Sequence, residues 1–437
     1  MIIPNRPRIK RIHDRGWKPI AETLVNIASR PGVLCRSRSE WNTPGSDTRF
    51  CFNGEFDAAS LKGQSFSFSL RIMQNKLKSL FEPEPERLDY TLIHSTIEGR
   101  VVIVTGAAGS IGAELCRQIA RFKPAAIVGF DIAETPLFEI DREMRQAHPN
   151  VPFYAEIGNV QNRARLNAAF DKYRPALVYH AAAYKHVPLM EENPFEAIEN
   201  NVFGTLNVAH AAKHYETEIF ILISSDKAVG PTSVMGATKR VSELLLQSMQ
   251  RDGTRFIAVR FGNVLDSQGS VVGIFKKQIA AGGPVTVTHR EMRRYFMTIT
   301  EACQLVLQAS AIGTGGQICV LDMGEPIKIV DLAEALIQFA GLKPNEDIKI
   351  EFTGVRPGEK LYEELTSMFD DTVPTNHEQV RVCVGNCAPQ FDFDAWLKSL
   401  TEICSARDTV RLAAALQELL VDYTPSEYLL NKNAVAP

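Results

Sequence analysis

The sequence predicts an α/β fold built on a doubly wound parallel sheet. Three observations indicate it: a β-branched run at residues 101–105, a glycine-rich loop directly after that run, and a regular alternation of apolar runs with amphipathic stretches beyond it. Continuous apolar runs are typical of strands that are buried on both faces of a sheet. Strands that alternate with helices at this spacing form right-handed βαβ units, and these build a parallel sheet.

Five further strands are expected after the first one. They fall at residues 125–130, 152–155, 176–180, 219–224 and 256–260. The stretches between them have apolar residues at helical spacing. No repeat of the period found in solenoid proteins is present.

Residues 1 to about 97 have a different composition. Basic residues outnumber acidic ones in the first 40 residues, and Gly, Pro, Ser, Asn and Thr cluster at residues 37–46. Short helical patterns occur at residues 20–28 and 70–81. Pro83 and Pro85 then predict an extended linker, because each proline disfavours helix at the residue before it. We expect a partly disordered arm without catalytic groups.

The composition excludes several classes of function. The chain has 437 residues, of which 48 are basic and 51 acidic, giving a formal net charge of -3. No global positive field would therefore attract nucleic acid or an anionic membrane. No apolar run approaches the ~20 residues that span a bilayer, and no secretory signal follows the basic N-terminus. We expect a cytoplasmic, soluble protein with reduced cysteines.

A glycine-rich loop follows the first strand and opens a helix. Gly106, Gly109 and Gly112 form the pattern G-x-x-G-x-x-G, in which glycines permit a tight turn and a close approach of the backbone to a pyrophosphate. The helix N-terminus adds free N–H groups and the positive end of a dipole. Asp131 ends the next strand, where a carboxylate accepts hydrogen bonds from both ribose hydroxyls and repels a 2′-phosphate. The sequence therefore favours NAD over NADP.

A second set of motifs follows the later strands. The fourth strand ends in His180-Ala-Ala-Ala, Asn201 falls in the next helix, and residues 224–239 read S-S-D-K-A-V-G-P-T-S-V-M-G-A-T-K. Together with the glycine loop, these features resemble the extended short-chain dehydrogenase/reductase superfamily, and within it the CapD-like branch of UDP-N-acetylglucosamine 4,6-dehydratases. Further stretches agree, at residues 183–188, 260–265, 282–288, 294–298 and 355–360. The resemblance runs from about residue 88 to about residue 428.

The resemblance implies a redox-neutral elimination on UDP-N-acetylglucosamine for polysaccharide or glycan biosynthesis. NAD takes hydride from carbon 4, a base removes the carbon-5 proton, an acid protonates the departing 6-hydroxyl, and the hydride returns to carbon 6. By this analogy Lys227 is the candidate base, Asp226 the acid, Ser225 an orienting hydroxyl and Lys239 a ligand of the cofactor ribose. Proton transfer is required at the carboxyl end of the fifth strand, where this ionisable pair lies. Which of Asp226 and Lys227 takes the carbon-4 hydroxyl proton stays open.

The sequence departs from the superfamily pattern at Met235, which stands where a catalytic tyrosine would precede Lys239 by one helical turn. A thioether cannot exchange a proton, so the acid-base work falls to Asp226 and Lys227. Met235 is expected to pack against the substrate or the nicotinamide, or simply in the core. Asn159 likewise replaces an aspartate that touches adenine, and its side-chain oxygen can still accept a hydrogen bond.

The resemblance also supplies the expected binding residues. Those for the cofactor are Gly106, Gly109, Ser110, Ile111, Gly112, Asp131, Asn159, Val160, Ala181, Ala182 and Lys239. Those for the substrate are Lys185, Asn263, Arg294 and Arg356, since guanidinium groups match the charge of a diphosphate. No metal site is expected.

The expected organisation has three parts. Residues 1–97 form the arm and linker, residues 98–265 a Rossmann-type NAD-binding domain with the catalytic residues, and residues 266–437 a smaller nucleotide-sugar-binding α/β portion interleaved with it. We expect a homo-oligomer. Two alternatives remain: a UDP-N-acetylhexosamine 4-epimerase, against which Met235 argues, and a catalytically inactive nucleotide-sugar-binding protein, against which the intact Asp226 and Lys227 argue.

Overall fold

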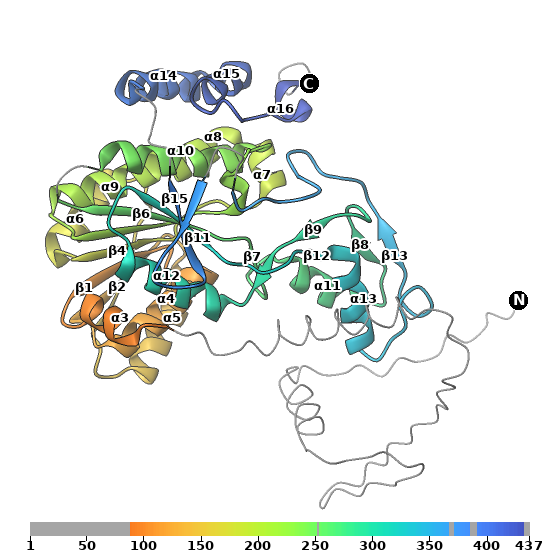
Figure 1. Ribbon diagram of the computed structural model, residues 1–437, viewed down its shortest axis with the longest axis horizontal. Helices are drawn as coiled ribbons and strands as arrows, with labels where there is room; N and C mark the ends of the chain where they lie inside the picture. The colour runs from red at the N-terminus through yellow and green to blue at the C-terminus, as the bar shows by residue number, and fades with distance from the viewer. Residues whose placement is uncertain (1–87, 251–252, 367–370, 385–390, 432–437) are drawn as a thin grey trace, which may run out of the picture. The chain divides into compact units, whose positions relative to one another are not determined.

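The computed structural model describes residues 88–250, 253–366, 371–384 and 391–431, and a nine-stranded sheet forms the centre of this part (Figure 1). Its strands are β1 (Val101–Thr105), β2 (Ala126–Asp131), β3 (Phe153–Ile157), β4 (Leu177–His180), β5 (Ile219–Ile223), β6 (Arg255–Arg260), β11 (Gln317–Leu321), β14 (Asp371–Pro374) and β15 (Val380–Val384). The spatial order is β14-β15-β11-β6-β5-β4-β1-β2-β3.

The sheet is parallel from β3 to β11, and β15 and β14 add an antiparallel edge. Strand β1 pairs with β2 from Val101 opposite Ala126, and with β4 from Val102 opposite Leu177. The predicted doubly wound sheet is confirmed, and its six predicted strands lie within two residues of the observed ones. The strand order reverses between β1 and β4, and ligands of such sheets bind at the carboxyl ends of the strands beside this reversal.

Helices cover both faces of the sheet. One face carries α3 (Tyr90–Ile97), α4 (Ser110–Ile119), η1 (Ala120–Phe122), α5 (Glu134–Ala147) and α12 (Ile299–Ile312), and the other carries α6 (Arg163–Tyr173), α9 (Gly204–His214) and α10 (Val234–Met249). In β1, Val102 and Val104 enter the first apolar cluster and Ile103 enters the second. Successive side chains of a strand point to opposite faces, so one strand supplies both cores.

Helix α3 changes the boundary of the N-terminal segment. The composition predicts a segment that ends at residue 97, yet Ile93 and Ile97 are fully buried in an apolar core on one face of the sheet. The side chain of Asp89 caps the helix by accepting a hydrogen bond from Leu92 N. The folded part therefore includes residues 88–97. The helical patterns expected at residues 20–28 and 70–81 lie outside the described residues.

A smaller portion with its own apolar cluster is interleaved with the sheet. It contains β7 (Asn263–Val264), α11 (Val271–Ala280), β8 (Val285–Val287), β9 (Arg293–Arg294), β10 (Phe296–Met297), β12 (Ile327–Lys328), α13 (Ile329–Phe339) and β13 (Ile350–Phe352). Short two-stranded pairings join β10 to β7, β12 to β9 and β13 to β8. Because β11, β14 and β15 return to the main sheet, the chain passes between the two portions several times (Figure 1).

Helix α10 is buried on nearly all sides. Three helices precede α10 along the chain: α7 (Val187–Glu192), α8 (Pro194–Ala197) and the π-helix η2 (Ile198–Phe203). Three more come after the last strand: α14 (Phe393–Ala406), α15 (Thr409–Leu419) and α16 (Glu427–Asn431). Trp396, Leu400 and Leu416 from α14 and α15 share an apolar cluster with Val241 and Leu245 of α10. All residues of α10 from Val234 to Leu246 are buried, because the sheet lies on one side, α7, α8 and η2 pack against the helix, and α14–α15 add residues to its apolar cluster.

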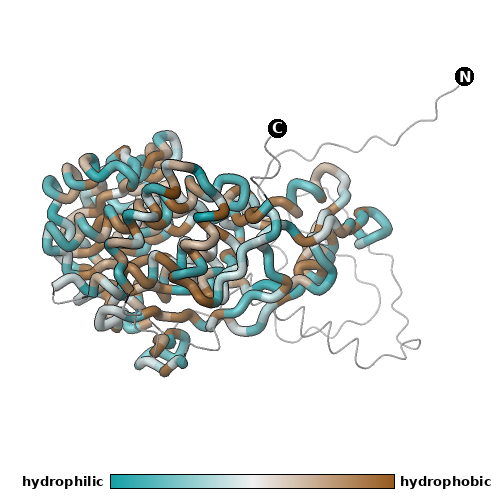
Figure 2. The backbone as a smooth tube through the Cα atoms, turned by 90° about the horizontal axis from the view of Figure 1, so that it is seen from above, coloured by the Kyte–Doolittle hydropathy of each residue, from teal (hydrophilic) through white to brown (hydrophobic). Residues whose placement is uncertain are grey.

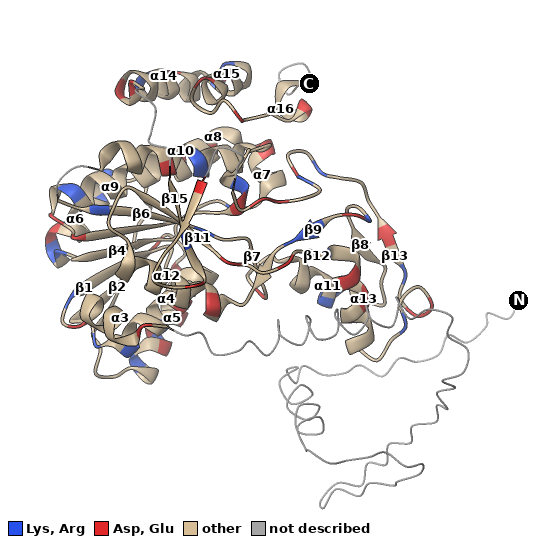
Figure 3. Ribbon diagram, viewed as in Figure 1, with Lys and Arg blue, Asp and Glu red and all other residues tan. Residues whose placement is uncertain are grey.

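The distribution of polarity agrees with this layering. Hydrophobic and hydrophilic stretches alternate along the backbone tube in Figure 2, and hydrophilic stretches are frequent at its outer edge. Lys and Arg are interspersed with Asp and Glu over the elements in Figure 3. Among the residues described by the structure, no helix combines the length and the apolar character that crossing a membrane requires.

Candidate active site

The glycine loop between β1 and α4 forms a cradle for a phosphate group. A Cβ atom at Gly106 would lie 2.6 Å from Ala182 N, and one at Gly112 would lie 2.0 Å from Gly106 O, so only glycine fits either position. Gly106 also has a φ of +70°. Gly109 precedes α4 without any side-chain cap. The first N–H groups of α4 are therefore left for an anion, which fits a pyrophosphate.

Asp131 lies beside this loop at the end of β2. Its Oδ2 accepts a hydrogen bond from Ala108 N at 2.9 Å, and its Oδ1 accepts one from Ala133 N at 2.9 Å. A carboxylate oxygen can accept a second bond, so both oxygens can still bind ribose hydroxyls. Together with the glycine cradle, this carboxylate fits an adenine dinucleotide such as NAD.

Other predicted cofactor residues have local partners. The Ser110 hydroxyl accepts a hydrogen bond from Gln268 N at 3.0 Å, and the Asn159 side chain accepts one from Gln161 N at 2.9 Å. Val160 is buried, and a Cβ atom at Gly204 would lie 2.8 Å from it. The hydrogen bond between Gln268 and Ser110 shows that the loop after β7 lies against the start of α4.

The turn after β5 brings together four of the predicted site residues. Ser225 caps the 3₁₀ turn η3 (Asp226–Ala228), and its hydroxyl donates to Asp226 Oδ1 at 2.9 Å. Lys227 Nζ donates to Asp226 Oδ1 at 3.0 Å and to Asn263 Oδ1 at 3.2 Å. The Asp226 side chain is 0% exposed and that of Lys227 20% exposed. The predicted acid-base pair is therefore a mostly buried ion pair.

A carboxylate that was not predicted from the sequence completes this cluster. Glu363 Oε1 lies 3.4 Å from Lys227 Nζ, and the Glu363 side chain is 3% exposed. Burial alone would lower the pKa of the Lys227 ammonium, but the Asp226 and Glu363 carboxylates outweigh this effect and raise the pKa. Lys227 is therefore charged in this state, and its expected action as a base requires that it first lose a proton.

The two predicted residues on α10 differ in their surroundings. Met235 is buried in an apolar cluster with Val187 and Met190, which favours the core alternative among its expected roles. Lys239 is also buried, and this burial lowers its pKa to about 8.

The predicted substrate-binding cations lie in two environments. Arg294 is buried and donates to Arg293 O at 2.7 Å and Lys360 O at 2.8 Å, so it braces the chain after β13. Lys185 and Arg356 are exposed. Partial burial and the charges of Lys185 and Arg356 lower the pKa of His186.

A second group that the sequence did not reveal supports the turn after β5. Glu243 on α10 accepts a hydrogen bond from the Ser224 hydroxyl at 2.6 Å. The buried Arg260 guanidinium donates to both Glu243 oxygens, at 2.9 and 2.8 Å, and Arg240 donates at 3.0 Å. Glu243 lies one helical turn after Lys239, and this spacing was the available signal in the sequence. No such signal distinguishes Glu363 from its acidic neighbours.

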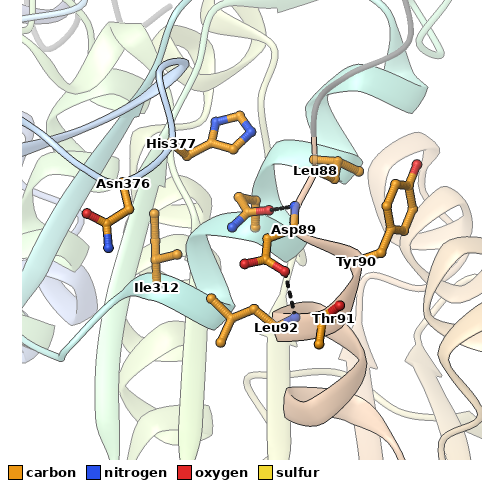
Figure 4. A pocket seen from close by; sticks show the side chains of 9 residues that line it. Leu88, Asp89, Tyr90, Thr91, Leu92, Ile312, Asn376 and His377 are labelled. Carbon is orange, nitrogen blue, oxygen red and sulfur yellow. Dashed lines mark hydrogen bonds between the residues drawn. The ribbon is translucent and has the colours of Figure 1, made fainter.

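A separate pocket of about 550 Å³ lies at the start of α3 (Figure 4). Its lining includes Asp89, Tyr90 and His377, and Gln308 Oε1 there accepts a hydrogen bond from Asp89 N at 2.8 Å. None of the predicted site residues lines this pocket. Asp89 and Gln308 there anchor the first turn of α3.

Comparison with known proteins identifies the family. The family described as "Polysaccharide biosynthesis protein" matches residues 102–384. The chain belongs to this family. The predicted membership of the CapD-like branch of the extended short-chain dehydrogenase/reductase superfamily is confirmed, and the chain is grouped with the nucleotide-sugar dehydratases and epimerases of polysaccharide biosynthesis.

Three relatives illustrate the similarity. The capsular polysaccharide biosynthesis protein CapD of Staphylococcus aureus is 53% identical over 293 residues, which cover 66% of this chain and 49% of CapD. The UDP-N-acetylglucosamine 4,6-dehydratase (inverting) of Campylobacter jejuni is 34% identical, over 54% of this chain and 70% of that enzyme. The solved structure of Pen from Bacillus thuringiensis is 34% identical with a TM-score of 0.62, over 67% of this chain and 90% of Pen. The chain spans about half the length of CapD.

Proposed function

We propose that the chain is an NAD-dependent UDP-N-acetylglucosamine 4,6-dehydratase of polysaccharide biosynthesis. One observation carries the proposal: the Asp226–Lys227 ion pair lies at the carboxyl end of β5, while Met235 replaces the tyrosine that would otherwise exchange protons. Such a pair can serve proton transfer at carbons 5 and 6 of a hexose. The name of the Campylobacter relative supports the same substrate and reaction.

The residues of the cradle would hold NAD. The glycine loop and the N-terminus of α4 would bind its pyrophosphate, Asp131 a ribose of its adenosine, and Lys239 a cofactor ribose. When bound, NAD supplies the group that takes hydride from carbon 4 and returns it to carbon 6. Denaturation of the purified protein should release NAD, detected by chromatography. Release of NADP would contradict the role of Asp131.

Asp226 and Lys227 would move the protons. Asp226 Oδ1 is occupied by Ser225 and Lys227, whereas Oδ2 is buried and has no partner among the described residues. Oδ2 is therefore the atom from which Asp226 would protonate the 6-hydroxyl. Asp226, a carboxylate in the ion pair, would first take up at Oδ2 the proton that the carbon-4 hydroxyl releases as carbon 4 is oxidised, and would then pass it to the 6-hydroxyl, which leaves as water. With Asp226 protonated, its negative charge no longer favours the Lys227 ammonium, so Lys227 would release its proton to solvent and remove the carbon-5 proton. Lys227 would return a proton to carbon 5 when hydride is added at carbon 6.

The diphosphate of the substrate would be bound by Lys185 and Arg356. Both are exposed cations, and the charge of each lowers the pKa of His186. Arg356 pairs with Glu359 at 2.5 Å, so a diphosphate would compete with this carboxylate for the guanidinium. Asn263 would contribute its side-chain amide. Arg294 would not contact the diphosphate and would instead stabilise the loop after β13 by donating to the carbonyl groups of residues 360 and 361.

A product assay tests the function. The protein is incubated with UDP-N-acetylglucosamine in deuterated water, and the nucleotide sugar is examined by mass spectrometry and NMR. A dehydratase yields a product that has lost one water and carries deuterium at carbon 5. An isomer of unchanged composition would instead identify a 4-epimerase, and recovery of unchanged sugar would indicate a protein that only binds it.

A further inference from the structure

Glu363 reaches the catalytic turn from a distant part of the chain. It follows β13, and its neighbours Tyr362 and Glu364 are exposed while Glu363 itself is buried. Its Oε1 lies 3.4 Å from Lys227 Nζ and 3.7 Å from Arg294 Nε. Among the acidic residues at positions 359–364, Glu363 alone is buried in this way.

The backbone around Glu363 is fastened to the same turn. Lys360 Nζ donates to Val229 O at 2.8 Å, directly after η3. The Thr232 hydroxyl donates to Gly358 O at 3.1 Å. On the other side, Arg294 binds the carbonyl groups of Lys360 and Leu361. These hydrogen bonds hold the loop after β13 in the conformation that places Glu363 beside Lys227.

Two oxygens of this cluster have no partner among the residues that the structure describes. They are Asp226 Oδ2 and Glu363 Oε2, and both are buried. A Cβ atom at Gly262 would lie 3.2 Å from Asp226 Oδ2, so the glycine keeps space beside that oxygen. Burying an unpaired carboxylate oxygen destabilises a fold, and such atoms in native structures call for a functional explanation.

The charges of the cluster balance. Asp226 from η3 and Glu363 from the loop after β13 face Lys227 together with Arg294 from β9, while Asn263 from β7 contributes a neutral oxygen. Two carboxylates and two cations therefore share one mostly buried volume. Removing one carboxylate would leave an excess positive charge there, which is unfavourable in a region of low dielectric.

We propose that Glu363 is a positioning residue of this site, whose carboxylate holds the Lys227 ammonium against Asp226. The role of Lys227 in this statement rests on the proposed dehydratase function. Since Glu363 favours the ammonium, its removal should lower the pKa of Lys227, and an opposite charge at this distance typically shifts a pKa by about one unit or more.

The first test measures the charge of Lys227 without using the reaction. The full-length protein is acetylated competitively over a series of pH values, and the peptide with Lys227 is quantified by mass spectrometry. Glu363→Gln should lower the titration midpoint of Lys227 by about one pH unit. Glu363→Asp, which restores the charge, should move the midpoint back toward that of the wild type. Glu364→Gln makes the same change one residue further on, at an exposed position, and should leave the midpoint unchanged.

The second test follows kcat/KM for UDP-N-acetylglucosamine against pH. The acidic limb of this pH profile reports the pKa of the base. It should move to lower pH by about one unit in Glu363→Gln and should not move in Glu364→Gln. If wild-type protein forms no product, the dehydratase proposal fails, and the acetylation result still decides the role of Glu363. A folded Glu363→Gln variant whose Lys227 titrates as in the wild type overturns the proposal.

Discussion

At the scale of single residues, the site depends on charges that are buried in pairs. Asp226 and Lys227 are adjacent in sequence, and Asp226 is completely shielded from solvent. Breaking a buried pair is costly because it leaves the remaining charge without compensation. Variants at these positions are therefore informative only when the fold and the NAD content are measured alongside turnover.

Asp226→Asn should abolish proton donation while keeping the shape of the side chain. General acid-base groups contribute about 100- to 10,000-fold, so kcat should fall by a factor in this range with little change in substrate binding. Met235→Leu keeps the apolar volume in the cluster with Val187 and should cost less than about 1.5 kcal/mol in stability. Steady-state kinetics at matched NAD occupancy compare the two variants. A dead Met235→Leu beside a normal Asp226→Asn would reverse the assignment.

Lys227→Met removes the amine that is assigned to carbon 5. Solvent deuterium should no longer enter the sugar at this position, because no base removes the carbon-5 proton. NMR of the recovered nucleotide sugar measures the exchange. Exchange at the wild-type rate in this variant would assign the base to another group.

Lys239 makes stability depend on pH. Burial lowers its pKa in the folded state to about 8, whereas the unfolded chain has the ordinary value of 10.5. Between these values the unfolded state binds the proton more strongly, so stability rises with pH from about 8 to about 10.5. Lys239→Met should stabilise the NAD-free fold at pH 7, and the gain should shrink as the pH rises through this window. Denaturant unfolding at pH 7 and pH 9.5 measures both; a pH-independent difference would contradict the burial of a charged amine.

At the scale of elements, helices α14 and α15 turn α10 into an interior helix. Trp396 and Leu400 share an apolar cluster with Val241 and Leu245 of α10, and Trp396 Nε1 donates to Ala415 O at 3.0 Å, which joins the two outer helices. The outer pair therefore helps to hold the helix that carries Met235 and Lys239.

Leu400→Ala should destabilise the fold by about 2–5 kcal/mol, because Leu400 is fully buried and its truncation leaves a cavity. Val410→Ala on α15 is a suitable control, since Val410 is 52% exposed and should change stability by no more than about 0.5 kcal/mol. Denaturant unfolding compares the two. Equal effects would show that Leu400 is not buried in this apolar cluster in solution.

At the scale of the whole molecule, the N-terminal boundary can be tested by truncation. Removal of residues 1–85 should leave turnover largely intact, because no catalytic motif lies there. Removal of residues 1–97 also deletes α3 and exposes the core that Ile93 and Ile97 cover, so the melting temperature should fall sharply. Activity and thermal melts of both truncations provide the measurement. A folded, NAD-loaded 86–437 fragment without turnover would assign the N-terminal segment a part in the site.

The sequence by itself determined the parallel sheet, the glycine cradle with Asp131, and the Asp226–Lys227 pair. Each depends on residues that are neighbours along the chain, such as a strand and the loop at its end, and local patterns report these well. Helix α3 was missed although its Asp89 cap and apolar spacing were present, because the proline-rich stretch before it extended the predicted arm too far.

Only the tertiary structure decided which distant groups complete the site. Glu363 resembles Glu359 and Glu364 in sequence, and it differs only because the loop after β13 folds back onto the turn after β5. The burial of Arg294 arises in the same way, from carbonyl groups of residues far along the chain. A residue type specifies which contacts are possible, whereas burial and proximity, which set the charge of Lys227, follow from the packing of remote segments.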